Sequence, residues 1–246
     1  MQQASIIKSD SIILNNNIID IKKKIVIHQP MFLPYTGIIS KINDGDVFVF
    51  LDDVQFEDGE FQHRNRILTK NGIMWFTVPL QSPRYKMKIR DIKITYTKQW
   101  RENLLKTIQY VYGKAPYFKE VFDIMREILS EQHTYLVDLN IASTLKILEY
   151  LGIKKEVKLS SEIKGKPEDR IDRIINIVDS LNGNTYISGD GAKVYMDSVR
   201  FEAKNINVEF QNYKCKEYKQ LWSDVFVPYM SILDYMMYMG SDTSKL

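Results

Sequence analysis

The chain has 246 residues, of which 44% are hydrophobic, 26% charged and 12% aromatic, a length and composition that suit one sizeable globular domain and exclude a chain that is disordered throughout. Its 34 basic and 31 acidic residues leave a formal net charge of +3, which is too small to predict nucleic-acid binding from charge alone. A single cysteine excludes an internal disulfide and a cysteine-based zinc site.

The first 23 residues carry the weakest pattern in the chain. Their apolar stretch at 12–14 is interrupted by three asparagines and followed by Asp20, so we predict neither a signal peptide nor a membrane span. We expect a lead-in over residues 1–23 with one short strand, and then a single domain over residues 24–246. The scarcity of cysteine is compatible with a cytoplasmic protein.

The domain begins with a pattern typical of a βαβ unit. We predict a strand at 24–27, a loop that contains Pro30 and Pro34, a helix from Tyr35 to Asp44 and a continuous apolar strand at 47–51. Because a fully apolar strand is buried on both faces, it favours a parallel sheet.

The middle of the chain changes period twice. Two alternating segments flank Asn71-Gly72 and predict a β-hairpin over 66–78, and a further strand is expected at 88–95. Apolar residues three and four apart then predict helices at 100–112, 117–129 and 133–151, which form a helical annex over about 97–151.

The last third alternates between strands and helices again. We predict strands at 157–159, 185–188 and 206–210, and helices at 167–181, 192–204 and 230–239. The fold class is therefore α/β, with a mostly parallel sheet in a Rossmann-like layered arrangement, a β-hairpin insertion and a helical region in the middle of the chain.

Charge is segregated more sharply than the total suggests. Residues 41–62 hold seven acidic residues against one lysine, and residues 63–93 hold eight basic residues against Asp91 alone. The functional interpretation is an acidic loop that faces a basic phosphate-binding flank. The alternative is two solvated faces that form salt bridges with each other.

Polar side chains follow the first two strands of the predicted sheet. His28 and Gln29 come directly after the first strand, where ligands bind in open α/β sheets, so His28 is the best candidate for a general base; the alternative is a histidine that only hydrogen-bonds its loop. Asp52 and Asp53 end the second strand. Since neighbouring strand residues point to opposite faces, we expect one of them to enter the site, where it would orient His28, bind a ribose hydroxyl or hold magnesium.

Two further segments offer donors. His63 adds a second base, and Arg64 or Arg66 could clamp a phosphate, although salt bridges to Asp58 or Glu60 are the alternative. The glycines of 188–191 allow an anion to approach a helix start, but they also suit a plain turn. The chain shows no metal-ligand spacing, dinucleotide fingerprint or P-loop, so no metal site is predicted.

An ordered series of motifs covers nearly the whole chain: HQPMFLPYTG at 28–37, DDVQF at 52–56, RNRI at 64–67, WFTVP at 75–79, YISGDGA at 186–192 followed by Tyr195, and SILD at 231–234. In this order, over about 25–240, they resemble the WbqC-like protein family. Tyr35 departs from the tryptophan expected in many members. The positions that carry the resemblance are His28, Gln29, Asp52, Asp53, Gln55, Arg64, Asn65, Ser188, Gly189 and Tyr195, and the resemblance assigns no chemical role to any of them.

The resemblance implies an enzyme of bacterial O-antigen, lipopolysaccharide or other surface polysaccharide biosynthesis, with a glycine or other aminoacyl transferase activity. We expect glycine to pass to the amine of a nucleotide-linked amino-sugar. His28 would be the base, Asp52 or Asp53 its orienting group, Gln29 and Asn65 the oxyanion or sugar-hydroxyl donors, and Arg64 with Arg66 the phosphate clamp. Tyr35, Gln55, His63, Ser188, Gly189 and Tyr195 complete the predicted binding residues.

The sequence leaves the acyl donor open among an aminoacyl-tRNA, a carrier thioester and an adenylate. ATP with magnesium is the expected cofactor if the acyl group is activated in situ, and otherwise none is required. Nucleic acid is not expected as a partner except for tRNA as donor, which would bind the basic 64–93 stretch with a strong salt dependence. The alternatives are another sugar-modifying transferase and a non-catalytic sugar-nucleotide-binding module.

Overall fold

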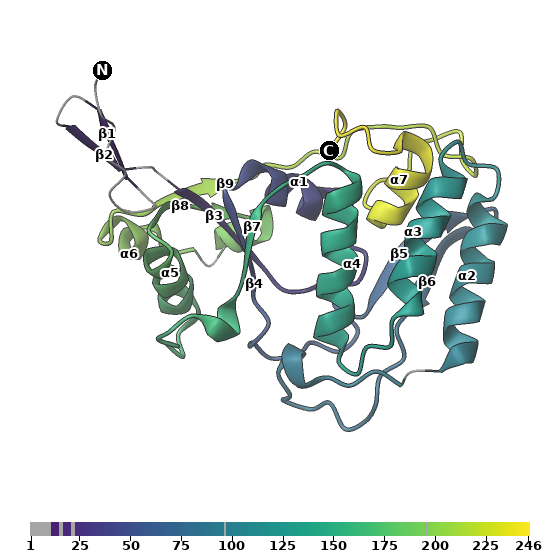
Figure 1. Ribbon diagram of the computed structural model, residues 1–246, viewed down its shortest axis with the longest axis horizontal. Coiled ribbons are helices and arrows are strands. Elements are labelled where there is room, and N and C mark those ends of the chain that lie inside the picture. The colour runs from purple at the N-terminus through teal and green to yellow at the C-terminus, as the bar shows by residue number, and fades with distance from the viewer. Residues whose placement is uncertain (1–10, 15–16, 21–22, 96, 195) are drawn as a thin grey trace, which may run out of the picture.

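A five-stranded parallel sheet is the centre of the protein (Figure 1). The computed structural model describes residues 11–14, 17–20, 23–95, 97–194 and 196–246. The strand order is β7 (Glu156–Leu159), β4 (Val47–Phe50), β3 (Lys23–His28), β8 (Gly183–Ser188) and β9 (Asn207–Phe210), and every neighbouring pair is parallel. This topology confirms the predicted α/β class.

Alternation along the two central strands builds a core on each face of the sheet. Val26, Phe48 and Phe50 face a large apolar core that includes α1 (Thr36–Asp44). Ile25 and Val49 face a smaller core with α5 (Arg170–Ser180) and α6 (Ser198–Glu202). Because successive strand residues point to opposite faces, continuous apolar strands require a layer on each side, and the structure supplies both.

The predicted helical region shares the larger of these cores. It consists of α2 (Lys98–Tyr112), α3 (Phe118–Ser130) and α4 (Leu136–Tyr150), and it packs with α7 (Ile232–Met239). Leu136 and Ile147 lie in the same apolar cluster as Phe48 of the sheet and Ile39 of α1. Among the described residues, no helix is long and apolar enough to cross a membrane.

The predicted hairpin is confirmed as β5 (Arg64–Thr69) and β6 (Gly72–Thr77), which pair antiparallel. Thr69 pairs with Gly72, so Lys70 and Asn71 form the turn. Only Gly72 has a positive φ, of 98°, which differs from the two positive φ angles expected for Asn71-Gly72. The hairpin lies beside α2 in Figure 1.

Three predicted elements differ from the structure. Residues 88–95 form a short 3-10 helix (Ile89–Asp91) and isolated bridges in place of a strand, because their isoleucines are buried in a loop that bonds to Val54 and Thr134. The predicted helix at 192–204 is a 3-10 turn (Asp190–Val194) followed by α6, since the Asp190 carboxylate holds that turn to the backbone of Asn212 and Tyr213. The lead-in contains two paired strands, β1 (Ser11–Leu14) and β2 (Asn17–Asp20), where one was expected.

The loop that joins β3 to α1 is fixed by buried amides. The Asn140 side chain donates to the carbonyls of Pro30 and Gln62, at 3.1 and 2.8 Å. The Asn65 side chain donates to the carbonyls of Phe32 and Leu33, at 3.2 and 2.7 Å. Buried carbonyls need such partners because water cannot reach them. The loop therefore has a defined shape without regular secondary structure.

The substitution Asn65→Ala tests this anchoring. We expect the free energy of unfolding to fall by about 2–4 kcal/mol, because the Phe32 carbonyl and the Arg66 N–H lose this partner in a buried site and the Leu33 carbonyl keeps only the Ser231 hydroxyl. Urea unfolding measures the change. Asn103→Ala, on the exposed face of α2, is the matched control and should change stability by less than about 0.5 kcal/mol. A loss below about 1 kcal/mol for Asn65→Ala would mean that the loop does not depend on this amide.

Candidate functional site

The candidate site lies at the carboxyl ends of β3 and β8. From β3 the chain builds outward to β4 and β7 on one side, and to β8 and β9 on the other. In open α/β sheets such a reversal leaves a crevice between the two loops that leave the neighbouring strands, and ligands bind there. His28 ends β3 and Ser188 ends β8, so both lie at the edge of the sheet where this crevice is expected.

His28 is held as a neutral imidazole. Its Nδ1 lies 3.0 Å from the carbonyl of Gln29, which assigns the ring proton to Nδ1 and leaves a lone pair on Nε2. Burial and then the nearby Lys41 ammonium lower the pKa of His28 to about 3. The Gln29 carbonyl thus orients the ring, in place of the predicted carboxylate of Asp52 or Asp53.

Lys41 of α1 is the main residue that the sequence reasoning missed. Its side chain is 3% exposed, and the described residues offer it no hydrogen bond and no ion pair. Helical side chains lean toward the start of their helix, and a Cβ built on Gly189 would lie 3.9 Å from the Lys41 Nζ. The ammonium therefore faces the loop after β8, beside His28.

The environment of Lys41 makes it a site for an anion. Burial lowers the pKa of Lys41 to about 8, so the ammonium is charged in most molecules at neutral pH. A buried charge without a counterion is unfavourable unless something compensates it. One feature of the sequence could have identified Lys41. It lies three residues after Ile38, inside the apolar stripe of the helix, where a lysine is unexpected.

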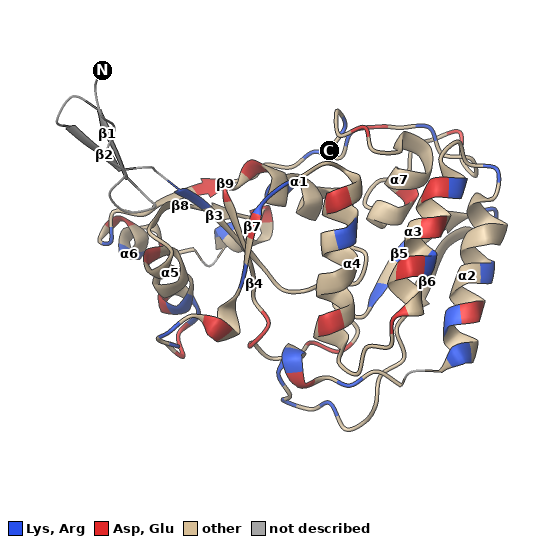
Figure 2. Ribbon diagram, in the orientation of Figure 1, with Lys and Arg blue, Asp and Glu red and all other residues tan. Residues whose placement is uncertain are grey.

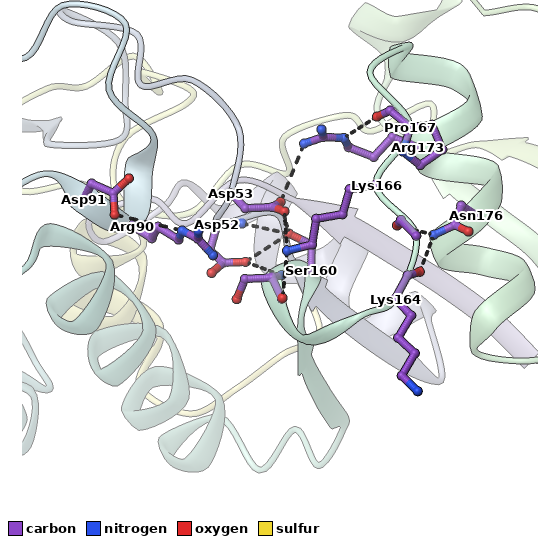
Figure 3. Close-up of polar contacts among 12 residues, drawn as sticks. Asp52, Asp53, Arg90, Asp91, Ser160, Lys164, Lys166, Pro167, Arg173 and Asn176 are labelled. Atoms are coloured by element: carbon purple, nitrogen blue, oxygen red, sulfur yellow. Dashed lines mark hydrogen bonds and ion pairs between the residues drawn. The ribbon is translucent and has the colours of Figure 1, made fainter.

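Asp52 and Asp53 form a separate polar cluster at the ends of β4 and β7 (Figure 3). The Ser160 hydroxyl lies 2.9 Å from Asp52 Oδ1 and 2.6 Å from Asp53 Oδ1, and Ser161 N–H donates to Asp52. Both carboxylates are buried and share this one hydroxyl, whereas we expected only one to enter the site. No local pattern predicts the contact with Ser160, which lies 107 residues after Asp53.

Two cations complete the Asp53 environment. Lys166 Nζ lies 3.4 Å from Asp53 Oδ2, and Arg173 lies 3.7 Å from Oδ1. Burial raises the pKa of Asp53, but the Ser160 hydrogen bond, Arg173 and Lys166 outweigh it and leave the pKa below its ordinary value. This carboxylate is therefore ionised and already compensated at neutral pH. Among the described residues, no group of three or more His, Cys, Asp or Glu side chains could hold a metal ion.

Asn65 cannot act as the predicted donor to substrate. It is fully buried, both hydrogens of its amide are used on loop carbonyls, and its oxygen accepts from the Arg66 N–H. Gln29 differs, because its oxygen accepts from the Gln62 amide at 2.8 Å while its own nitrogen has no bond to a described residue. Of the two predicted donors, only Gln29 remains available.

Arg64 and Arg66 lie on β5 without acidic partners among the described residues. Neither arginine forms the alternative salt bridge to Asp58 or Glu60 in the described part of the chain. Asp58 pairs with Arg84 instead, at 2.7 Å. His63 lies nearby, 3.8 Å from Asp58, and burial lowers its pKa.

The remaining predicted residues are dispersed. Ser188 is buried, and Gly189 lies at the crevice. Tyr35 precedes α1, with its ring between Tyr213 and Tyr229. Gln55 is exposed and bridges to Lys88, away from the crevice, and Tyr195 lies outside the described residues. The structure thus gathers His28, Gln29, Ser188 and Gly189 with Lys41, and leaves the Asp52 cluster one strand away.

The substitution Lys41→Met tests the uncompensated charge. At neutral pH the folded protein holds this ammonium at an unfavourable pKa of about 8 against the ordinary 10.5, so the variant should be more stable by roughly 1–3 kcal/mol. The difference should shrink as the pH rises from about 8 to 10.5, because the folded wild type then loses the proton first. Chemical unfolding at several pH values measures it. A variant that is less stable than the wild type at pH 7 would show that Lys41 is compensated.

Comparisons with known proteins give one family match and a relative of similar length. The pattern that defines the WbqC-like protein family matches residues 29–246. The uncharacterized protein Rv1507c of Mycobacterium tuberculosis is 33% identical over 223 residues, which cover 89% of this chain and 95% of that protein. No solved structure matches the chain. The match to the family pattern, which includes every element from the His28 loop to α7, shows that the chain belongs to the WbqC-like protein family.

Proposed function

We propose that the protein transfers an aminoacyl group, glycine in the first instance, to the amine of a nucleotide-linked amino-sugar. Membership of the WbqC-like family suggests an enzyme linked to polysaccharide biosynthesis, and surface polysaccharide of bacteria is the setting that we propose. The observation that carries the reaction type is the pair formed by a neutral His28 and a buried, uncompensated Lys41 at the crevice between β3 and β8.

Acyl transfer to an amine needs two things from the protein. A proton must leave the attacking amine, and negative charge must be stabilised on the carbonyl oxygen. His28 Nε2 has the free lone pair for the proton, and the Lys41 ammonium with the Gln29 amide would donate to the oxyanion. The new C–N bond forms as the bond to the leaving group breaks, and the proton passes through His28 to that group.

The low pKa of His28 sets a condition on this mechanism. A base with a pKa of about 3 is a weak proton acceptor at neutral pH. Its pKa is depressed in part by the Lys41 charge, so an anion bound at Lys41 would offset that charge and raise the basicity of the ring. In the proposed reaction the oxyanion that develops beside Lys41 would supply this negative charge, so the basicity of His28 would rise as the acyl group is attacked.

A second function is favoured by the same low pKa. A histidine that stays neutral is also suited to hydrogen-bonding a sugar hydroxyl, as in a non-catalytic sugar-nucleotide-binding module. The donor remains open among an aminoacyl-tRNA, a carrier thioester and an adenylate, the last requiring ATP with magnesium. Asp52 and Asp53 take no part in the steps proposed here, because they are bonded to Ser160 one strand away from His28.

A transfer assay separates the two functions. The protein is incubated with a nucleotide-linked amino-sugar, labelled glycine and each of the three donor types, and the glycyl mass increment is followed by mass spectrometry. His28→Ala and Lys41→Met should each lower the rate by about 100-fold or more. His133→Gln, outside the crevice, is the matched control and should leave the rate unchanged. No increment with any donor, or a full rate in His28→Ala, contradicts the proposed transferase.

The coupling of His28 to Lys41 can be measured without a substrate. In NMR titrations the His28 ring of the free protein should show no protonation between pH 5 and 8. Lys41→Met, or saturating pyrophosphate with the wild type, should move its pKa upward by about 1 unit or more because the neighbouring charge is removed or offset. An unchanged His28 pKa in both cases would show that the two side chains are not coupled.

A further inference from the structure

We infer that an arginine-aromatic strip, formed by Trp75, Arg64, Arg66, Tyr229 and Tyr35, binds the nucleoside diphosphate part of the acceptor. The identity of this ligand rests on the proposed function. The strip runs from β6 through β5 to the start of α1, the helix that carries Lys41. Figure 2 shows the basic residues on β5, and neither strand of the hairpin contains an acid.

The two arginines present positive charge that no described carboxylate neutralises. No carboxylate among the described residues lies within ion-pair distance of either guanidinium. The Nε atoms of Arg64 and Arg66 are both buried without a hydrogen-bond partner. The only side-chain hydrogen bond of Arg66 in the described part of the chain goes to the Tyr229 carbonyl, at 3.0 Å. A diphosphate could not reach these buried Nε atoms, so its oxygens would bind the terminal nitrogens of the two guanidinium groups.

Aromatic rings hold the arginines in place and remain partly uncovered. The Arg64 guanidinium lies 4.4 Å from the centre of the Trp75 ring, and that of Arg66 lies 5.7 Å from the same ring. Trp75 is 42% exposed and Tyr229 is 46% exposed. Tyr229 also has a φ of 61°, which is unusual for a tyrosine and brings backbone strain to this surface. Exposed rings of this kind can stack on a base or on the apolar face of a sugar.

The strip leads to the candidate site. The Tyr35 ring lies 5.9 Å from Tyr229 and 6.1 Å from Tyr213. The Tyr213 hydroxyl bonds to Thr36 in the first turn of α1, and its N–H bonds to Asp190 in the loop after β8. The same loop contains Gly189, which faces Lys41. Contacts therefore lead from the Trp75 ring through the arginines and the tyrosines to the loop after β8, which Lys41 faces.

This order matches the order of groups in a nucleoside diphosphate amino-sugar, which runs from base through diphosphate and sugar to amine. A single-stranded RNA could also use rings and arginines. The strip has only two such cations, however, and the chain has a net charge of +3, whereas RNA binding depends on many phosphate contacts. The structure thus favours the nucleotide sugar over the nucleic acid.

Calorimetric titration with UDP, GDP and dTDP tests the strip directly. We expect at least one of the three to bind the wild type, and Arg64→Gln and Trp75→Ala each to weaken its affinity by about tenfold. Two matched controls remove the same groups from the neighbouring 84–85 segment. Arg84→Gln removes a guanidinium that is paired with Asp58, and Tyr85→Ala removes a ring that is 82% exposed. Both should stay within twofold of the wild type.

Three results would overturn the inference. They are equal affinities of the strip variants and the wild type, equal losses in the two controls, and tighter strip-dependent binding of a random single-stranded RNA than of any diphosphate. The proposed transfer can fail separately. Strip-dependent diphosphate binding without glycyl transfer supports the strip and contradicts the transferase. Transfer with an unchanged KM in Arg64→Gln and Trp75→Ala contradicts the strip alone.

Discussion

A buried lysine that has no counterion among the described residues is the constraint on which the candidate site depends. Lys41 is 3% exposed and lies beside a histidine whose pKa it helps to depress. Moving a charge out of water is unfavourable, and proteins ordinarily compensate it with a carboxylate. Here the acidic pair Asp52 and Asp53 lies one strand away and is compensated by Ser160, Lys166 and Arg173, and Asp190 pairs with Lys193. The fold thus keeps the positive charge of Lys41 available for a ligand.

Such a site requires rigid surroundings, because a mobile loop would let the lysine escape to solvent. The segment from β3 to α1 has no regular structure, but Asn65, Asn140 and Ser231 bond its carbonyls from three different elements. These side chains therefore serve the site through the loop that they hold. Residues that look like polar candidates in a sequence can carry this indirect role, and Asn65 is the example here.

Local pattern was enough to predict the frame of the protein. The apolar runs at 24–27 and 47–51 identified parallel strands, and His28 followed from where the first strand ends. Contacts between distant residues were not predictable in this way, as the meeting of Asp52 with Ser160 across 108 residues shows. The isoleucines at 89, 92 and 94 led to a wrong strand prediction, because apolar residues can also be buried in an irregular loop. The direction of the Lys41 side chain, on which the candidate site depends, was likewise not predicted.

The cations of the candidate site and of the strip differ from three other basic side chains in having no acidic partner among the described residues. Arg84, Lys166 and Arg173 each have an acidic neighbour, whereas Lys41, Arg64 and Arg66 have none among the described residues. The three uncompensated cations are the ones beside exposed tyrosine and tryptophan rings or beside His28. An anion that carries rings would satisfy them together, whereas an inorganic ion would satisfy only one end. The distribution of missing partners therefore describes the ligand: extended, negatively charged near its middle, and with a proton-bearing group at the His28 end.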